Sequence, residues 1–114
     1  MKIEVFYIDG CPNHLPTVER VKTMLEDLGV AGEVVESAVV DPATASAVRF
    51  LGSPTVQING VDVEPSARTS KHFGLMCRTY LNGPQREGIP PQALMREALL
   101  EACNLLHEGM IETG

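Results

Sequence analysis

The sequence predicts a single α/β domain, residues 1–114, in which helices flank a central mixed sheet of about four strands. Three observations predict this fold class. Short apolar runs typical of strands alternate with segments that have the periodicity of amphipathic helices. An Asn-Gly pair between two of the apolar runs is a strong hairpin signal. The length of 114 residues is enough for one hydrophobic core but too short for two.

The first expected strand covers residues 2–8. Ile3, Val5 and Tyr7 lie on one of its faces, and Phe6 and Ile8 lie on the other. Apolar residues on both faces are typical of a strand that is covered from both sides. We therefore expect this strand in the centre of the sheet.

An amphipathic helix is expected next, beginning at Pro12 or Pro16 and ending at Leu28. Either proline fits the first turn of a helix, because the N–H groups there have no intrahelical partner. Gly29 ends the helical pattern. The apolar positions recur at intervals of three and four residues, as expected for one buried face: Val18, Val21, Leu25 and Leu28.

A second strand is expected over residues 33–40, followed by a short helix over residues 42–51. Asp41 and Pro42 form a strong helix start, with the aspartate as the cap and the proline in the first helical position. An antiparallel hairpin needs only a short turn. Strands joined by a helix of this length therefore predict a right-handed parallel crossover.

The third strand is expected at residues 55–58, and Asn59-Gly60 turns it back into an antiparallel strand at residues 61–63. Residues 64–90 are interrupted by proline and glycine and predict an irregular insertion, with a short strand at residues 76–81. A final helix follows Pro90-Pro91. Its apolar stripe consists of Leu94, Ala98, Leu99, Ala102, Leu105 and Leu106.

Charge and composition exclude several classes of protein. A net charge of −6, without clusters of Lys and Arg, argues against a nucleic-acid partner. No stretch approaches the roughly 20 apolar residues that span a membrane. The amino terminus lacks the apolar core of a secretory signal, which predicts a cytoplasmic location. Three widely spaced cysteines do not form the framework of a disulfide-rich secreted domain. No pattern implies a cofactor or a resident metal.

Cys11 is the candidate nucleophile. It directly follows the first strand and precedes the first helix, where the positive end of the helix dipole favours thiolate over thiol. His14 lies three residues further on, and as imidazolium it would stabilise that thiolate. The alternatives are an inert cysteine at a strand end and a histidine that faces solvent.

The other two cysteines have different expected roles. Cys77 lies beside Arg78, whose charge favours thiolate, and it is either a resolving thiol or a structural residue of an edge strand. Cys103 lies on the apolar side of the final helix, where the spacing suits a core residue.

Three stretches of the chain resemble a known family. They are Asp-Gly-Cys-Pro-Asn-His at residues 9–14, Leu-Gly-Ser-Pro-Thr at residues 51–55 and Cys-Arg-x-Tyr at residues 77–80. With the expected order of elements, they resemble the thioredoxin-like fold over nearly the whole chain. The likeness is greater to a family of small bacterial thioredoxin-like proteins, some with selenocysteine at the first cysteine position and some labelled alkylmercury lyase. This resemblance implies redox or soft-metal chemistry at Cys11.

The resemblance also implies how the surrounding residues are arranged. Pro54 matches the proline that is cis in the thioredoxin-like fold, in a loop beside the reactive cysteine. Ser53 would then offer its backbone to an extended substrate. The substrate contacts implied in this way are Pro12, Ser53, Pro54 and Thr55. An ordinary trans turn at Pro54 is the alternative.

The chain departs from the thioredoxin pattern at His14, where thioredoxins have a second cysteine. A disulfide cannot close within the motif. A mixed disulfide or sulfenic acid on Cys11 must be resolved by another thiol, either glutathione or Cys77.

The sequence thus favours a thiol-disulfide oxidoreductase, or a protein that handles peroxides or electrophiles, acting on a small thiol or a protein disulfide. One alternative is a soft-metal protein that binds Cu, Zn or Hg through Cys11, His14 and Cys77. Another is an interaction module without chemistry, in which a strand edge or residues 64–90 build a homodimer.

Overall fold

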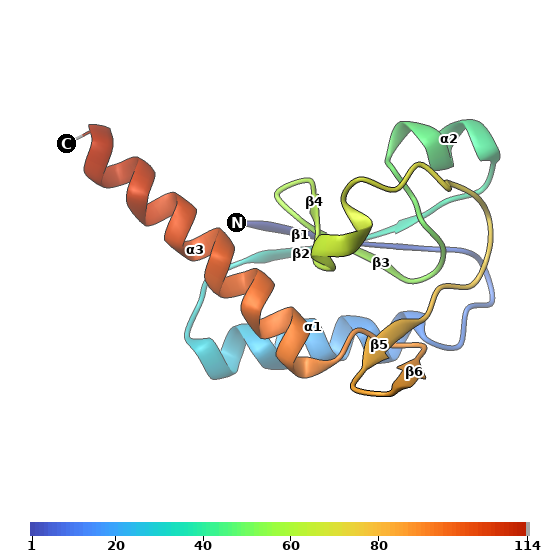
Figure 1. Ribbon diagram of the computed structural model, residues 1–114, viewed down its shortest axis with the longest axis horizontal. Helices are drawn as coiled ribbons and strands as arrows, with labels where there is room; N and C mark the ends of the chain where they lie inside the picture. Colours follow the sequence, from blue (N-terminus) through green and yellow to red (C-terminus); the bar gives the residue numbers. More distant parts are fainter. Residues whose placement is uncertain (114) are drawn as a thin grey trace.

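The structure is a computed structural model that describes the backbone of residues 1–113 and the side chains of residues 1–104. Figure 1 shows the arrangement of its elements. In chain order they are β1 (Lys2–Tyr7), α1 (His14–Leu28), β2 (Glu33–Ala38), α2 (Pro42–Ala47), β3 (Thr55–Ile58), β4 (Val61–Asp62), the 3-10 turn η1 (Pro65–Ala67), β5 (Tyr80–Asn82), β6 (Gln85–Glu87) and α3 (Gln92–Thr113).

Four strands form one mixed sheet in the order β2-β1-β3-β4. β1 and β2 are parallel, with Ile3 opposite Val34, whereas β1 and β3 are antiparallel, with Val5 opposite Val56. β3 and β4 form the antiparallel hairpin that was expected at Asn59-Gly60. The predicted α/β class, the mixed sheet of four strands and the central position of β1 are confirmed.

The direction of β3 differs from the prediction. We expected β2 and β3 to run parallel because a helix joins them, but β3 is antiparallel to β1 and therefore also to β2. α2 ends at Ala47, earlier than expected, and the chain then turns through two residues of positive φ, Arg49 at 58° and Gly52 at 109°. This turn brings β3 to the other side of β1 in the reversed direction. The parallel pair is instead β1 and β2, which α1 connects.

Helices cover both faces of the sheet, and Figure 1 shows α1 below it and α2 above it. On one face, Ile3 and Val5 of β1 pack in a core with residues of α1 and α3. On the other face, Phe6 packs with Val39, Ala45 and Phe50. The two apolar faces of the first strand are therefore both buried, as its sequence predicts.

Several local signals have the predicted effect. Gly29 ends α1 in the left-handed conformation, at φ 64°. Asn59 and Gly60 have φ values of 51° and 83°, as a two-residue hairpin turn of type I′ requires. Asp41 caps α2 by accepting a 2.7 Å hydrogen bond from the Thr44 amide. The hydrogen bonds from Thr44 lower the pKa of the Asp41 carboxyl below its ordinary value.

The irregular segment from residue 64 to residue 90 contains a separate hairpin of β5 and β6. The strand expected over residues 76–81 is therefore largely wrong, because β5 begins only at Tyr80. In α3, Leu94, Ala98, Leu99 and Ala102 face the core as predicted. Leu105 and Leu106 lie outside the described side chains. Among the helices of the described part of the chain, none is long and apolar enough to cross a membrane.

Candidate thiol site

Cys11 lies in the turn that joins β1 to α1, as predicted. Its amide donates a 3.2 Å hydrogen bond to the carbonyl oxygen of Ile8, and its own carbonyl accepts a 3.3 Å bond from the His14 amide. The thiol is free and half-buried. Cys11 thus precedes the first residue of α1 by three positions, close to the positive end of the helix dipole.

The imidazole of His14 is held by two residues of the sheet. Its Nε2 atom lies 2.7 Å from the Oε1 atom of Glu36 on β2. The ring also stacks on Tyr7 of β1, with 3.5 Å between the ring centroids and 8° between the planes. Because the His14 side chain is only 15% exposed, the alternative of a solvent-facing histidine is wrong. The described contacts of the ring are with Glu36 and Tyr7 rather than with the thiol.

The rest of the motif packs on the segment that follows β6. A Cβ atom added at Gly88 would lie only 2.3 Å from Nδ2 of Asn13, so the Asn13 amide rests directly on the glycine backbone. Pro12, the other predicted contact residue in this turn, is exposed. The segment that follows β6 therefore packs against the turn that carries Cys11.

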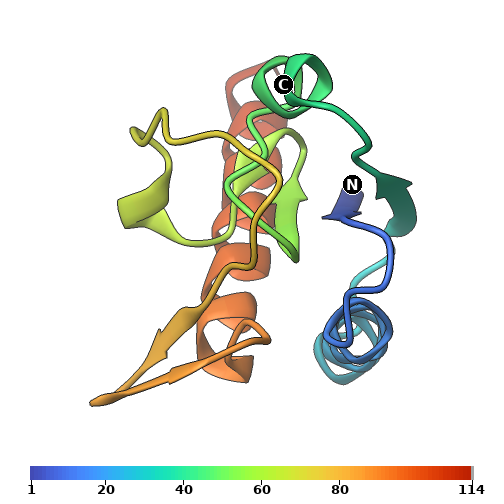
Figure 2. The same cartoon turned by 90° about the vertical axis from the view of Figure 1, so that its right-hand side faces the viewer.

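Ser53 connects the two segments that carry Cys11 and Cys77. Its Oγ atom accepts a 3.1 Å hydrogen bond from the Ile8 amide, at the end of β1. Its backbone forms an isolated parallel bridge with Cys77. Figure 2 views this end of the molecule, where the loop before β3 (green) and the segment leading to β5 (gold) cross, with the turn after β1 (blue) to their right. The bond between Ser53 and Pro54 is cis, as the resemblance implied.

A buried ion pair lies next to Cys77, and the sequence analysis missed it. Arg78 donates to both carboxylate oxygens of Asp62, at 2.7 and 2.9 Å, and to Glu64 at 3.3 Å. Its guanidinium lies over the ring of Tyr80, 4.4 Å from the centroid. Burial disfavours the charge, but the hydrogen bond and ion pair with Asp62 outweigh it and raise the pKa of Arg78.

The same network holds the loop before β3. The Tyr80 hydroxyl donates to the carbonyl oxygen of Pro54, and burial raises the pKa of this hydroxyl. The Thr55 hydroxyl accepts from Arg78 at 3.2 Å and donates to the Gly52 carbonyl at 2.6 Å. Pro54 and Thr55 are buried. Their described contacts are thus internal and fix the loop.

The arrangement of thiols bears on the alternative of a soft-metal site. Cys77 is free and exposed, and Cys103 on α3 is free and half-buried. Among the described residues, no three His, Cys, Asp or Glu side chains gather in a group that could hold a metal ion. Cys11, His14 and Cys77 therefore do not form a metal centre in this geometry.

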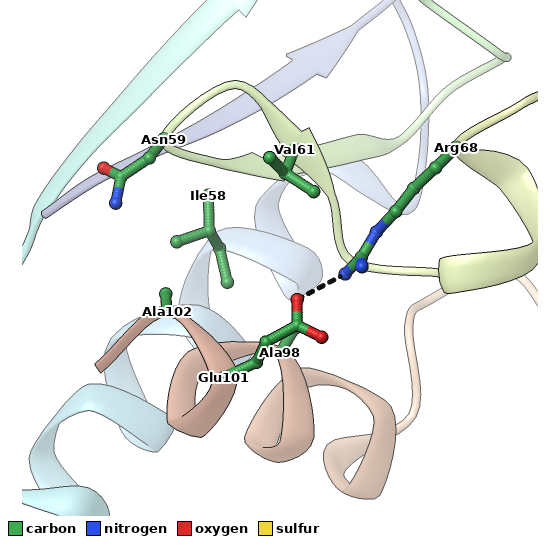
Figure 3. Close-up of a pocket in the computed structure, with 7 residues that line it drawn as sticks. All are labelled: Ile58, Asn59, Val61, Arg68, Ala98, Glu101 and Ala102. Carbon is green, nitrogen blue, oxygen red and sulfur yellow. Dashed lines mark ion pairs between the residues drawn. The ribbon is translucent and has the colours of Figure 1, made fainter. Parts of the chain in front are cut away.

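An apolar pocket lies at the opposite end of the sheet, between the β3–β4 hairpin and α3 (Figure 3). Ile58, Ala98 and Ala102 line it, and a 3.0 Å ion pair between Arg68 and Glu101 closes one side. Ile58 pairs with Ile3 near the start of β1, whereas Cys11 follows the end of that strand. The pocket is therefore separate from the thiol site, and among the described side chains no cysteine or histidine lines it.

Comparisons of the chain with protein-family models, curated proteins and solved structures found no match. Within the described chain, the feature that bears most directly on chemistry is Ser53, which contacts the segments that carry Cys11 and Cys77. Cys11 lies in the turn after Ile8, which Ser53 contacts, and Cys77 is paired with the backbone of Ser53.

Proposed function

We propose that the chain is a thioredoxin-like thiol redox protein in which Cys11 is the nucleophile and Cys77 is the resolving thiol. The observation that supports this most strongly is the position of Ser53, which contacts the segments of both cysteines. The strand order, the helices on both faces of the sheet and the cis Ser53–Pro54 bond also fit a thioredoxin-like fold. The reaction that these two thiols support is thiol-disulfide exchange.

The exchange proceeds in two steps. The Cys11 thiolate attacks one sulfur of a disulfide RSSR, so that a Cys11–SR bond forms, the S–S bond breaks, and RS⁻ leaves and takes up a proton. The Cys77 thiolate then attacks the sulfur of Cys11 and releases the second RS⁻. RSSR is thereby reduced by two electrons to two RSH, and the two protein thiols are oxidised to one disulfide.

His14 and Glu36 support the first step. A carboxylate oxygen of Glu36 at 2.7 Å from Nε2 orients the imidazole. His14 is the first residue of α1 and lies at the end of the helix that Cys11 precedes. In this role His14 supports the attack by Cys11, and Glu36 acts through His14.

The test uses a small excess of oxidised glutathione on the reduced, metal-free protein, with the cysteines mapped by peptide mass spectrometry. We expect a disulfide between Cys11 and Cys77 in the wild type. Cys77→Ser should leave a stable glutathione adduct on Cys11. The matched control Cys103→Ser should behave as the wild type does. Equal modification of the wild type and the Cys11→Ser variant would overturn the proposal.

A further inference from the structure

The chain's own residues 76–78 occupy the strand position beside Ser53. The Ser53 amide donates a 2.7 Å hydrogen bond to the carbonyl oxygen of Met76, and the Ser53 carbonyl accepts a 3.0 Å bond from the Arg78 amide. An extended peptide that adds to a strand edge binds through such backbone groups. At Ser53, both of these groups are already paired within the chain.

This internal strand is firmly held. Arg78 follows directly after Cys77 and is anchored in the interior by Asp62. Gly52 lies so close that a Cβ atom there would be 2.9 Å from Cβ of Arg78 and 3.2 Å from the Cys77 carbonyl oxygen. Displacing residues 76–78 would break a buried ion pair, which makes replacement by an incoming peptide costly.

The occupied edge leaves Ser53 without a free backbone group that a substrate could bind. Ser53, Pro54 and Thr55 are all buried. What stays exposed on the internal strand is Cys77, with Met76 before it. A substrate at this site therefore meets thiols and an apolar side chain, but no unpaired backbone groups of Ser53.

We infer that the site selects small disulfides, of peptide or non-peptide nature alike, and disfavours extended polypeptide disulfides. This inference rests on the proposed role of Cys11 as the nucleophile. Cys77 takes the position opposite Ser53 that a cysteine of a bound strand would otherwise take. A small disulfide needs only to bring one of its sulfurs to Cys11. Cys77 then supplies the second thiol, and the two-electron balance is the one given above.

The experiment compares rate constants for the reaction of Cys11 in the intact reduced protein with bis(2-hydroxyethyl) disulfide, oxidised glutathione and insulin. The two small disulfides should react at rates within a few-fold of each other. Insulin should be slower by about 10- to 100-fold, because ordering a polypeptide segment at the site costs conformational entropy that no backbone hydrogen bond to Ser53 offsets. Insulin rates equal to those of the small disulfides would overturn the inference and leave the proposed function intact. No reaction of Cys11 with any of the three would overturn the proposed function itself.

A variant and a second measurement test the occupied edge directly. Arg78→Lys keeps the positive charge but loses the two parallel hydrogen bonds to Asp62. It should therefore reduce the difference in rate constant between insulin and the small disulfides. The matched control is Arg86→Lys, on the exposed β6 strand, which should leave the difference in rate constant unchanged.

Hydrogen exchange of the Ser53 and Arg78 amides in the wild type should remain slow when insulin is added. Faster exchange would mean that polypeptides displace the internal strand, and would overturn the inference even if Arg78→Lys fails to fold.

Discussion

The two segments that carry the thiols are held in place by different forces. The Cys11 turn is fixed by local hydrogen bonds to Ile8 and His14 and by the hydrogen bond of His14 with Glu36, whose side chain is 40% exposed. The Cys77 segment is fixed by the pair of Arg78 and Asp62, whose side chains are only 6% and 7% exposed.

The difference matters because an ion pair gains strength from burial only while both partners are present. On the surface, water and salt replace a missing partner at little cost. In the interior, the remaining charge is left without compensation. The position of Cys77 therefore depends on interactions that stabilise the whole domain, whereas the position of the Cys11 turn depends mainly on contacts at the start of α1. The turn is the segment better able to adjust when the two sulfurs join.

The largest effect is expected for Arg78→Met, which leaves Asp62 and Glu64 without their cation. Removing one partner of a buried pair costs about 3–5 kcal/mol of the free energy of unfolding. The control is Glu101→Gln, which breaks the half-exposed pair with Arg68 and should cost about 1 kcal/mol or less. Urea denaturation at neutral pH measures both variants. Equal losses for the two would contradict the distinction between buried and exposed pairs.

A smaller effect is expected for Tyr80→Phe. The variant leaves the carbonyl oxygen of Pro54 without its hydroxyl donor in the interior, at a cost of about 1–3 kcal/mol. The control Tyr7→Phe alters a tyrosine that is only half-buried and should cost less.

Tyr80 also predicts how stability depends on pH. Burial raises the pKa of its hydroxyl above the ordinary value of 10.0, so the folded chain keeps the proton where the unfolded chain loses it. The contribution of Tyr80 is therefore complete below about pH 10 and falls as the pH rises further. Unfolding free energies between pH 7 and 11 should decline less steeply for Tyr80→Phe than for the wild type. Parallel curves would show that Tyr80 ionises equally in both states.

The elements that could be predicted from the sequence are those that short-range chemistry determines. The Asp41 cap, the stop at Gly29 and the Asn59-Gly60 turn each act within a few residues, and each is where it was expected. The position of Cys11 between strand and helix follows from the same kind of signal. The antiparallel direction of β3 depends instead on the route of residues 48–54, which no periodic pattern encodes.

The missed parts of the site depend on partners distant in the chain. Glu36 is 22 residues from His14 and becomes its neighbour only when β2 pairs beside β1. Asp62 is 16 residues from Arg78. A signal was nevertheless present, because Arg78 and Tyr80 are two positions apart and share one face of an extended segment. An aspartate between Val61 and Val63 in a hairpin strand is a second sign of a buried partner for a cation.

The smallest effect is expected at the more exposed pair, and it concerns reactivity rather than stability. Glu36→Gln removes the carboxylate that orients the His14 imidazole at the start of α1, so Cys11 should react more slowly at pH 7. An exposed pair contributes about 0.2–1 kcal/mol, which corresponds to at most about a fivefold slower reaction of Cys11 with iodoacetamide. Glu33→Gln, at the start of the same strand and also exposed, is the matched control and should react at the wild-type rate.

The pH profile of that reaction separates an electrostatic role of Glu36 from a purely structural one. At alkaline pH, where cysteine thiols ionise without a neighbouring cation, the rates of the wild type and Glu36→Gln should converge. If Glu36→Gln only loosened the turn, the rate of the Cys11 reaction would change at every pH. In that case His14→Gln would slow the reaction by the same factor at pH 7 and at alkaline pH. If the electrostatic role holds, His14→Gln should be at least as slow as Glu36→Gln at pH 7, because the carboxylate acts only through the imidazole.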